Sequence, residues 1–209
     1  MTTGKLAGED WEARSPAQKL ARIVSECCNP MITSFLTFVP ITLMTAPNPW
    51  KGFLWATITT LGFTVIPLLF IWLGVRRGKY TDHHVSVRSQ RLGPLLVALA
   101  SMVVAFVLLL CLQAARPLLA TMVAVIAVVL IATVITQFWK ISFHLVAVAG
   151  GVTAYCLLFG PRFLVLAPFV LLVGWARWQV RAHTALQACA GTVLAVTGTI
   201  IVFRFFGLI

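Results

Sequence analysis

Residues 94–139 read PLLVALASMVVAFVLLLCLQ AAR PLLATMVAVIAVVLIATVITQFW, and this stretch decides the fold class. It holds two apolar runs, 94–113 and 117–139, separated by three residues of which Arg116 is charged. A helix needs roughly 17–25 mostly apolar residues to cross a bilayer, so each run is long enough to span one. Both runs are unbroken rather than alternating, which excludes the strands of a membrane β-barrel.

The composition of the whole chain is also that of a membrane protein. Of its 209 residues, 60% are hydrophobic and 10% are charged, and the mean hydropathy is +0.99. A soluble domain of this length cannot bury so much apolar surface. Further apolar runs occupy 31–50, 52–75, 141–159, 161–176 and 184–209. The sequence therefore predicts an all-α, polytopic membrane helix bundle with six or seven transmembrane helices, and we favour seven.

The first thirty residues are more polar than the rest of the chain. Within them, 15–28 predicts a short amphipathic helix, with Ser15 as its N-cap and Pro16 at its first position. We expect the apolar side of this helix to lie in the membrane interface. We therefore divide the chain into a cytoplasmic N-terminal segment, 1–30, with an interfacial amphipathic helix, and a transmembrane domain, 31–209.

All four histidines lie beside arginine or lysine at the edges of apolar runs. They belong to three clusters, TDHHVSVRSQR at 81–91, WKISFH at 139–144 and ARWQVRAH at 176–183. Two apolar runs separate each cluster from the next, and an even number of crossings returns the chain to the same side. The three clusters are therefore predicted to meet on one membrane face, together with the N-terminus.

Positive charge predicts which face this is. The cluster face carries twelve of the sixteen Lys and Arg residues, and eight remain after four candidate site residues are removed. The opposite face carries Lys51, Arg116, Arg162 and Arg204. Cytoplasmic loops carry an excess of Lys and Arg, so the cluster face is predicted to be cytoplasmic in a multi-pass cell-membrane protein. The net charge of +11 suits anionic lipid headgroups better than nucleic acid, because the charges are scattered over loops.

The clusters have the residue types that phosphate chemistry requires. Arginine binds phosphate oxygens in pairs, and two histidines can divide the roles of nucleophile and acid. Singly, each residue has a structural explanation, such as Lys140 reaching from a helix end toward water. Jointly, ionisable groups between apolar spans favour a functional site. No metal or other cofactor is expected, since the five cysteines form no C-x-x-C pair and no pair of acids lies near a span.

The spacing of these residues resembles that of the type 2 phosphatidic acid phosphatases, which are related in fold to vanadium haloperoxidases. That family carries K-x6-R-P, P-S-G-H and S-R-x5-H-x3-D. This chain has, in the same order, His84-x6-Arg91-Leu92, Ile141-Ser142-Phe143-His144 and Ala176-Arg177-x5-His183-x3-Gln187. The resemblance covers about 80–191, and a glycine, Gly191, soon follows the last motif.

The resemblance implies a role for each matched residue. His183 is the expected nucleophile, His144 the acid that protonates the leaving oxygen, and Arg177 a further catalytic residue. The expected phosphate-binding residues are His84, Arg88, Arg91, Lys140, Ser142 and Arg177. The family uses no metal and hydrolyses lipid phosphates, so the implied partner is a membrane lipid phosphate or isoprenoid diphosphate.

Three motif positions depart from the family pattern. His84 replaces a lysine and is only partly charged near neutral pH. Phe143 replaces a glycine and adds bulk. Gln187 replaces the aspartate that orients the nucleophile, and an amide orients a ring without supplying charge. Asp82 is the one acid near a motif in the sequence.

Three functions therefore stay open. The first is a lipid-phosphate or polyprenyl-diphosphate phosphatase, weakened by the missing aspartate. The second is a catalytically weak or inactive phosphatase-like subunit that binds lipid or supports a membrane complex, with homo-oligomerisation also open. The third is a small transporter or channel. Membrane prenyltransferases and alcohol phosphotransferases are disfavoured, because both need aspartate-rich motifs that bind magnesium and this chain has no pair of acids near any span.

Overall fold

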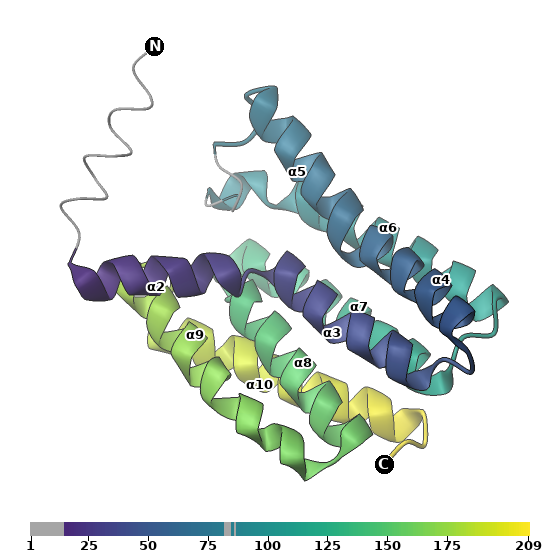
Figure 1. Cartoon of the computed structure of the whole chain (residues 1–209). Helices are drawn as coiled ribbons and strands as arrows, with labels where there is room; N and C mark the ends of the chain where they lie inside the picture. Colours follow the sequence, from purple (N-terminus) through teal and green to yellow (C-terminus); the bar gives the residue numbers. More distant parts are fainter. Residues whose placement is uncertain (1–14, 82–84, 86) are drawn as a thin grey trace.

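The computed structural model describes residues 15–81, 85 and 87–209, and this described part is helical throughout, with no strand (Figure 1). The helices are α2 (Pro16–Cys27), α3 (Pro30–Thr45), α4 (Pro49–Thr60), α5 (Ile66–Arg76), α6 (Leu92–Cys111), α7 (Arg116–Phe138), α8 (Phe143–Phe159), α9 (Ala167–Gln179) and α10 (Ala185–Phe205). A π-helical turn, Leu61–Val65, joins α4 to α5, and short 3-10 helices occupy Arg88–Gln90 and Pro161–Leu166. The predicted all-α bundle is confirmed.

The helices fall on the apolar runs of the sequence. Among the described residues, five segments are long and apolar enough to cross a membrane, namely Pro49–Arg76, Leu92–Cys111, Arg116–Phe138, Pro161–Gln179 and Ala185–Phe205. The pair α2 and α3 forms a sixth if its 48° bend is part of one span. Helix α8 is apolar but has only 17 residues. Length and composition thus support five or six spans, and the favoured count of seven requires α8 to cross as well.

The N-terminal helix begins as predicted. Ser15 is the N-cap of α2, its side chain accepts the backbone N–H of Gln18, and the Gln18 amide oxygen accepts the N–H of Ser15. This reciprocal pair fixes the first turn. Helix α2 packs across α9 and buries Ala21 and Ser25 there. Leu20 and Ile23 stay more than half exposed, which leaves an apolar edge available to the membrane interface.

The long segment Pro49–Arg76 is interrupted by its π-helical turn for a local reason. Pro67 has no N–H to donate to the carbonyl of Phe63, four residues earlier. In the same turn, the carbonyl of the neighbouring residue Gly62 accepts a hydrogen bond from the Ser101 hydroxyl of α6, at 2.7 Å. A Cβ at Gly62 would lie 2.4 Å from that of Ala105, so glycine allows α6 to approach this turn closely. Two further prolines lie within helices, Pro40 inside α3 and Pro168 in the first turn of α9.

The core lies between the helices that cross the bundle. Its largest fully buried side chains include Trp55, Phe38, Phe63 and Phe203, which come from four different segments. Helix α8 is central, because it contacts α3, α7, α9 and α10. Many other large apolar side chains point outward, as expected for a surface that faces lipid.

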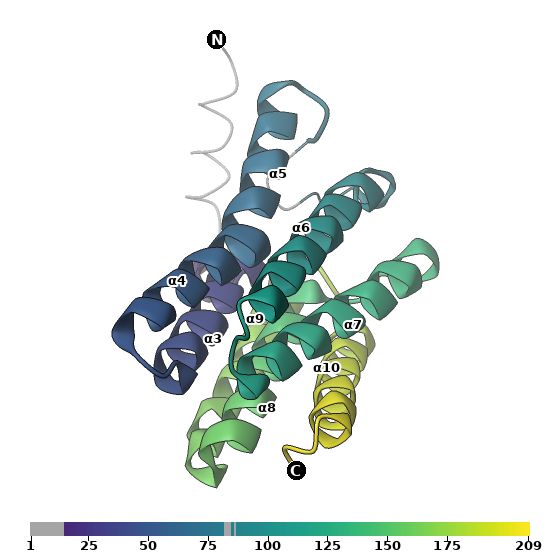
Figure 2. The ribbon, with the colours of Figure 1, turned by 90° about the vertical axis from the view of Figure 1, so that its right-hand side faces the viewer.

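The loops separate into two groups at opposite ends of the bundle (Figures 1 and 2). The links between α5 and α6, α7 and α8, and α9 and α10 lie at the end where α2 crosses the bundle. The links between α3 and α4, α6 and α7, and α8 and α9 lie at the other end with the C-terminus. This arrangement agrees with the crossing parity inferred from the sequence.

A labelling experiment tests which end faces the cytoplasm. In a cysteine-free background, Ala17→Cys reports on the end that carries α2, and Lys51→Cys reports on the opposite end; both positions are exposed. We expect an impermeant thiol reagent to label position 51 and not position 17 in intact cells, because the excess of positive charge lies at the α2 end. Labelling at 17 alone would reverse the orientation.

Candidate functional site

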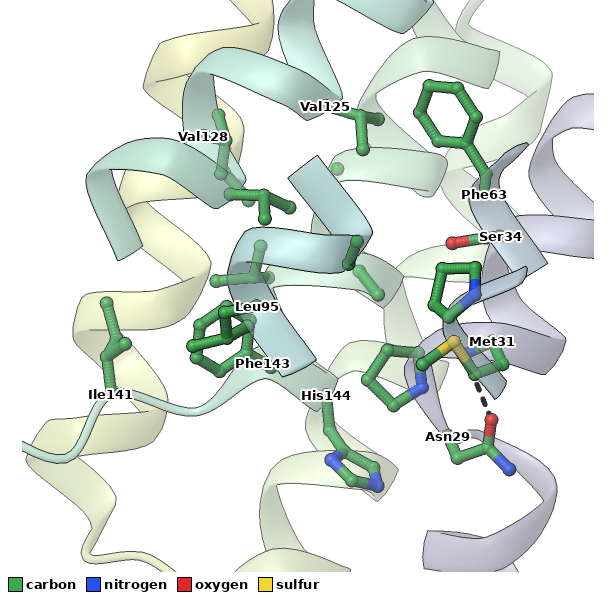
Figure 3. A pocket seen from close by; sticks show the side chains of 18 of the residues that line it. Asn29, Met31, Ser34, Phe63, Leu95, Val125, Val128, Ile141, Phe143 and His144 are labelled. Carbon is green, nitrogen blue, oxygen red and sulfur yellow. Dashed lines mark hydrogen bonds between the residues drawn. The ribbon is translucent and has the colours of Figure 1, made fainter. Parts of the chain in front are cut away.

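A partly open cavity of about 530 Å³ lies inside the bundle and reaches the end that α2 crosses. One part of its wall is cationic and the rest is mostly apolar. Figure 3 shows His144 and Asn29 at one end of the cavity and Phe63 and Val125 at the other. We call the first part the cationic end, formed by Arg91, Lys140, His144, Arg177, Arg181 and His183.

The cationic end brings together residues of all three sequence clusters. Arg91 immediately precedes α6, and its Nε donates to the carbonyl of Val85 at 2.9 Å. Lys140 lies in the link between α7 and α8, and His144 in the first turn of α8. Arg177 and His183 come from the end of α9 and the turn that follows it. The convergence predicted from helix parity is therefore present for these five residues.

The turn after α9 places His183 beside Arg177. Residues Ala182 and His183 both donate their backbone N–H groups to the carbonyl of Arg177, at 3.0 and 3.3 Å. Closing this turn puts Arg181 at φ 52°, in the left-handed region that side chains other than glycine rarely adopt. The chain thus reverses within a few residues, and the imidazole of His183 is only 8% exposed.

Helix α2 supplies two residues of this site that sequence reasoning missed. The Arg177 guanidinium donates to the hydroxyl of Ser25 at 2.6 Å, and Ser25 is 4% exposed. Glu26 lines the cavity and lies within electrostatic reach of Arg177. Asp82, the acid singled out in the sequence, lies outside the described residues. Among the described residues, the acid that lines the cavity is Glu26, which is distant from every motif in sequence.

The charges at the cationic end are not balanced. Among the described residues that line the cavity, Glu26 is the one carboxylate, against four Lys and Arg side chains. Burial, followed by the charges of Arg91 and Arg177, lowers the pKa of Lys140. Burial and the neighbouring cations Arg177, Lys140 and Arg91 lower the pKa of His183 to about 4. His183 is therefore neutral at physiological pH, and the site as a whole favours an anion.

Polar groups without hydrogen-bond partners gather near the cationic end. Within the described part of the chain, they include the Ser142 hydroxyl, the Arg177 Nε and the His183 Nδ1. Ser142 is fully buried at the N-cap of α8, where its hydroxyl makes no cap bond. Unmet buried polar groups are costly, and each one calls for an explanation such as a missing ligand or water.

Gly191 explains how α8 and α10 can approach at this point. A Cβ at Gly191 would lie 2.8 Å from the carbonyl oxygen of Ser142, closer than real Cβ atoms come to an oxygen. Glycine therefore lets the start of α8, with Ser142 and His144, pack directly on α10. Close packing of α8 on α10 therefore explains why a glycine follows the third motif.

Gln187 is already engaged by its own helix. Its side-chain amide oxygen accepts the backbone N–H of Thr184 at 3.1 Å, and the backbone N–H of Gln187 donates to the Thr184 hydroxyl at 3.3 Å. The side chain is close enough to His183 to raise the pKa of the imidazole slightly against the larger lowering effects. However, Nδ1 of His183 gains no hydrogen bond of acceptable geometry, because the amide oxygen is used in the helix cap.

Three of the predicted phosphate-binding residues are not placed at the cavity. Ser142 is fully buried and is not among the residues that line it. His84 lies outside the described residues. Arg88 begins the 3-10 turn Arg88–Gln90, but its side chain also lies outside the described part. Phe143, where the family has glycine, lines the cavity beside Leu95 (Figure 3).

Comparisons with protein-family models, with curated protein sequences and with solved structures find no match for this chain.

Proposed function

We propose that this chain is a membrane lipid-phosphate phosphatase that resembles the type 2 phosphatidic acid phosphatases and uses His183 as its nucleophile. One observation carries the proposal. Residues of three separated motifs line a single cavity whose other walls are mostly apolar. A phosphorylated lipid has the same two parts, an anionic head and a hydrocarbon tail.

The proposed reaction has two steps. The neutral imidazole of His183 attacks phosphorus, an N–P bond forms, and the bond to the leaving oxygen breaks while His144 donates a proton to it. Water then attacks the phosphorus of the phosphorylated His183 while His144 takes a proton from that water. A new O–P bond forms, the N–P bond breaks, and inorganic phosphate is released from the now neutral His183. Arg91, Arg177 and Lys140 balance the charge on the phosphate oxygens.

Several features of the site support these roles. A histidine with a pKa near 4 has a free electron pair at neutral pH, as a nucleophile requires. The first backbone N–H groups of α8 and α10 lie at the same end of the bundle, where helix N-termini favour anions. Arg177 is held by Ser25, so its side chain need not be ordered when the phosphate binds.

The second candidate function, a phosphatase-like subunit with little turnover, is favoured by one observation. In the described part of the structure, the carboxylate at the cavity belongs to Glu26 and acts on Arg177, whereas the pKa of His183 shows no influence of an acid. A histidine without an orienting carboxylate binds phosphate lipids in the same cavity but attacks phosphorus slowly.

The test is phosphate release by the purified chain from a panel of lipid phosphates in detergent. We expect slow release that chelators leave unchanged, because the proposed steps use protein groups alone. Orthovanadate is expected to inhibit, since it adopts the five-coordinate geometry of the transition state. Absence of release from every lipid, combined with normal binding of a non-hydrolysable phosphonate, would favour the subunit function instead.

A further inference from the structure

The apolar part of the cavity lies between the helices of the bundle and continues from the cationic end. Its walls come from six helices. One lining residue from each is Phe38 of α3, Ile71 of α5, Met102 of α6, Val125 of α7, Gly150 of α8 and Ala195 of α10. We call this part the apolar chamber. In Figure 3 it extends from the level of His144 toward Phe63 and Val125.

Gly150 in the wall of this chamber has no packing reason to be glycine. A Cβ added there would meet its nearest neighbours, Ala195 and Thr199, at 3.8 and 3.9 Å, which is ordinary van der Waals contact. Glycine inside a helix destabilises it relative to alanine. The chain therefore keeps a destabilising residue at a position where the protein itself would accept a side chain.

Two neighbouring glycines show the opposite case. A Cβ at Gly151 would lie 2.5 Å from the Thr37 hydroxyl, and one at Gly198 would lie 2.5 Å from the Val128 side chain. Both are needed for close helix packing. Gly150 differs from them because its missing side chain leaves space in the cavity instead of admitting another helix.

We propose that the apolar chamber holds one hydrocarbon chain of a phosphorylated lipid whose head lies at the cationic end, and that Gly150 leaves the space for that chain. The inference rests on the proposed function only for the identity of the head group. It adds that the preferred lipid has a single tail, as an isoprenoid phosphate or a monoacyl phosphate has, and that this tail enters the bundle.

The volume of the cavity supports a single hydrocarbon chain, and its charge supports an anionic head. The cavity of about 530 Å³ must also hold the phosphate, and this total lies within the range of sites for small, drug-sized ligands. One chain and a phosphate fit such a volume, whereas a diacyl lipid brings two long tails. The cationic end selects an anionic head over a neutral lipid or a detergent molecule.

The depth of the chamber allows a test by chain length. Gly150 follows His144 by six residues in α8, which places it ~9 Å farther along the helix axis. A butyl chain anchored by its phosphonate is too short to reach that depth, whereas a dodecyl chain passes it. Alkylphosphonates resist hydrolysis, so they report binding whether or not the chain is an enzyme.

The experiment compares Gly150→Leu with Gly174→Leu, measured by titration calorimetry on the full chain in one detergent. Gly174 is also inside a helix, has only Leu145 at 4.0 Å and does not line the cavity, so it is a matched control. For dodecylphosphonate, we expect Gly150→Leu to weaken binding by roughly tenfold, equivalent to about two displaced methylenes. Butylphosphonate should bind the wild type and both variants alike, and detergent partitioning cancels in the comparison.

A second pair of variants, Leu95→Trp and Leu96→Trp, keeps the test valid if Gly150→Leu does not fold. Leu95 lines the chamber, whereas the adjacent Leu96 is 53% exposed on the outside of α6. Leu95→Trp should weaken dodecylphosphonate binding and Leu96→Trp should not. A milder variant, Gly150→Ala, should raise the melting temperature of the empty protein and still weaken the binding of long chains.

Each outcome separates the two proposals. Equal effects on butyl- and dodecylphosphonate, or no effect on either, would overturn the chamber even if lipid phosphates are hydrolysed. If Gly150→Leu weakens the binding of a diacyl phosphonate more than it weakens the binding of a monoacyl phosphonate, the single-tail preference would be overturned. Chain-length-dependent binding without any phosphate release supports the chamber and contradicts the phosphatase.

Discussion

Replacing His183 by alanine is expected to reduce phosphate release to background, a loss of at least about a thousandfold if the wild type allows that range to be measured. The reason is that the variant has no atom to form the N–P bond. Binding of a short alkylphosphonate should fall far less, because Arg91, Lys140 and Arg177 remain at the cationic end. Release is followed with a lipid phosphate, and binding is measured by calorimetry.

The same experiment has a positional control and a partner variant. His83→Ala removes a histidine to which no role is assigned and should leave the rate unchanged. His144→Ala should slow substrates with poor leaving groups more than those with good ones, because only the former need a proton in the first step. A His183→Ala variant that folds, binds phosphonate and still releases phosphate at the wild-type rate would contradict the proposed nucleophile.

Giving His183 a neighbouring carboxylate should have the opposite effect on the rate. Gln187→Glu has nearly the same shape as the native side chain, and glutamate at this position can keep the reciprocal cap with Thr184. Loss of an orienting carboxylate costs about 10⁴ in rate in serine proteases. We expect Gln187→Glu to recover part of such a loss, roughly tenfold or more. Gln187→Asp should do so too, although its shorter side chain gives up the bond to Thr184.

The pH dependence shows whether the carboxylate acts through His183. The pKa of His183 is about 4 in the native site, so the rate should begin to fall only near that pH, as the imidazole becomes protonated. A carboxylate stabilises the imidazolium and raises this pKa, so the acid limb of the Gln187→Glu profile should move upward. Titration of the histidine by NMR would show the same shift.

A matched substitution on the same helix controls for general electrostatics. Cys189 is exposed on α10 two residues farther along, and Cys189→Glu should change neither the rate nor the acid limb. If Gln187→Glu raises the pKa of His183 without raising the rate, the missing carboxylate is not what limits turnover. If neither quantity changes, Gln187 is only the cap of α10.

The sequence predicted the helices well because apolar length is a local property. The run 117–139 became α7, Arg116–Phe138, and the run 184–209 became α10, Ala185–Phe205. The N-cap at Ser15 was also readable, since a cap depends on residues three positions apart. Only the span count stayed open, because α8 is apolar but short and α2 bends into α3.

The candidate site was predicted in part. Motif order and crossing parity brought Arg91, Lys140, His144, Arg177 and His183 to one end of the bundle, and the structure places them around one cavity. Ser25 and Glu26 could not be found in this way, because they lie at the polar end of α2 and belong to none of the three motifs. Ser25 meets Arg177 across 152 residues of sequence, through the packing of α2 on α9.

By itself, the sequence determined that the chain is helical, that several of its helices are long and apolar enough to cross a membrane, and that its charged clusters share one end. Span length, charge and parity need no knowledge of how the helices rotate against one another. Only the tertiary structure decided which side of each helix faces the cavity. It distinguished Gly150, which leaves space, from Gly151, which packs on Thr37, and it committed the Gln187 amide to the cap of α10. These outcomes depend on helix rotation and on contacts between residues far apart in the chain, which no local pattern encodes.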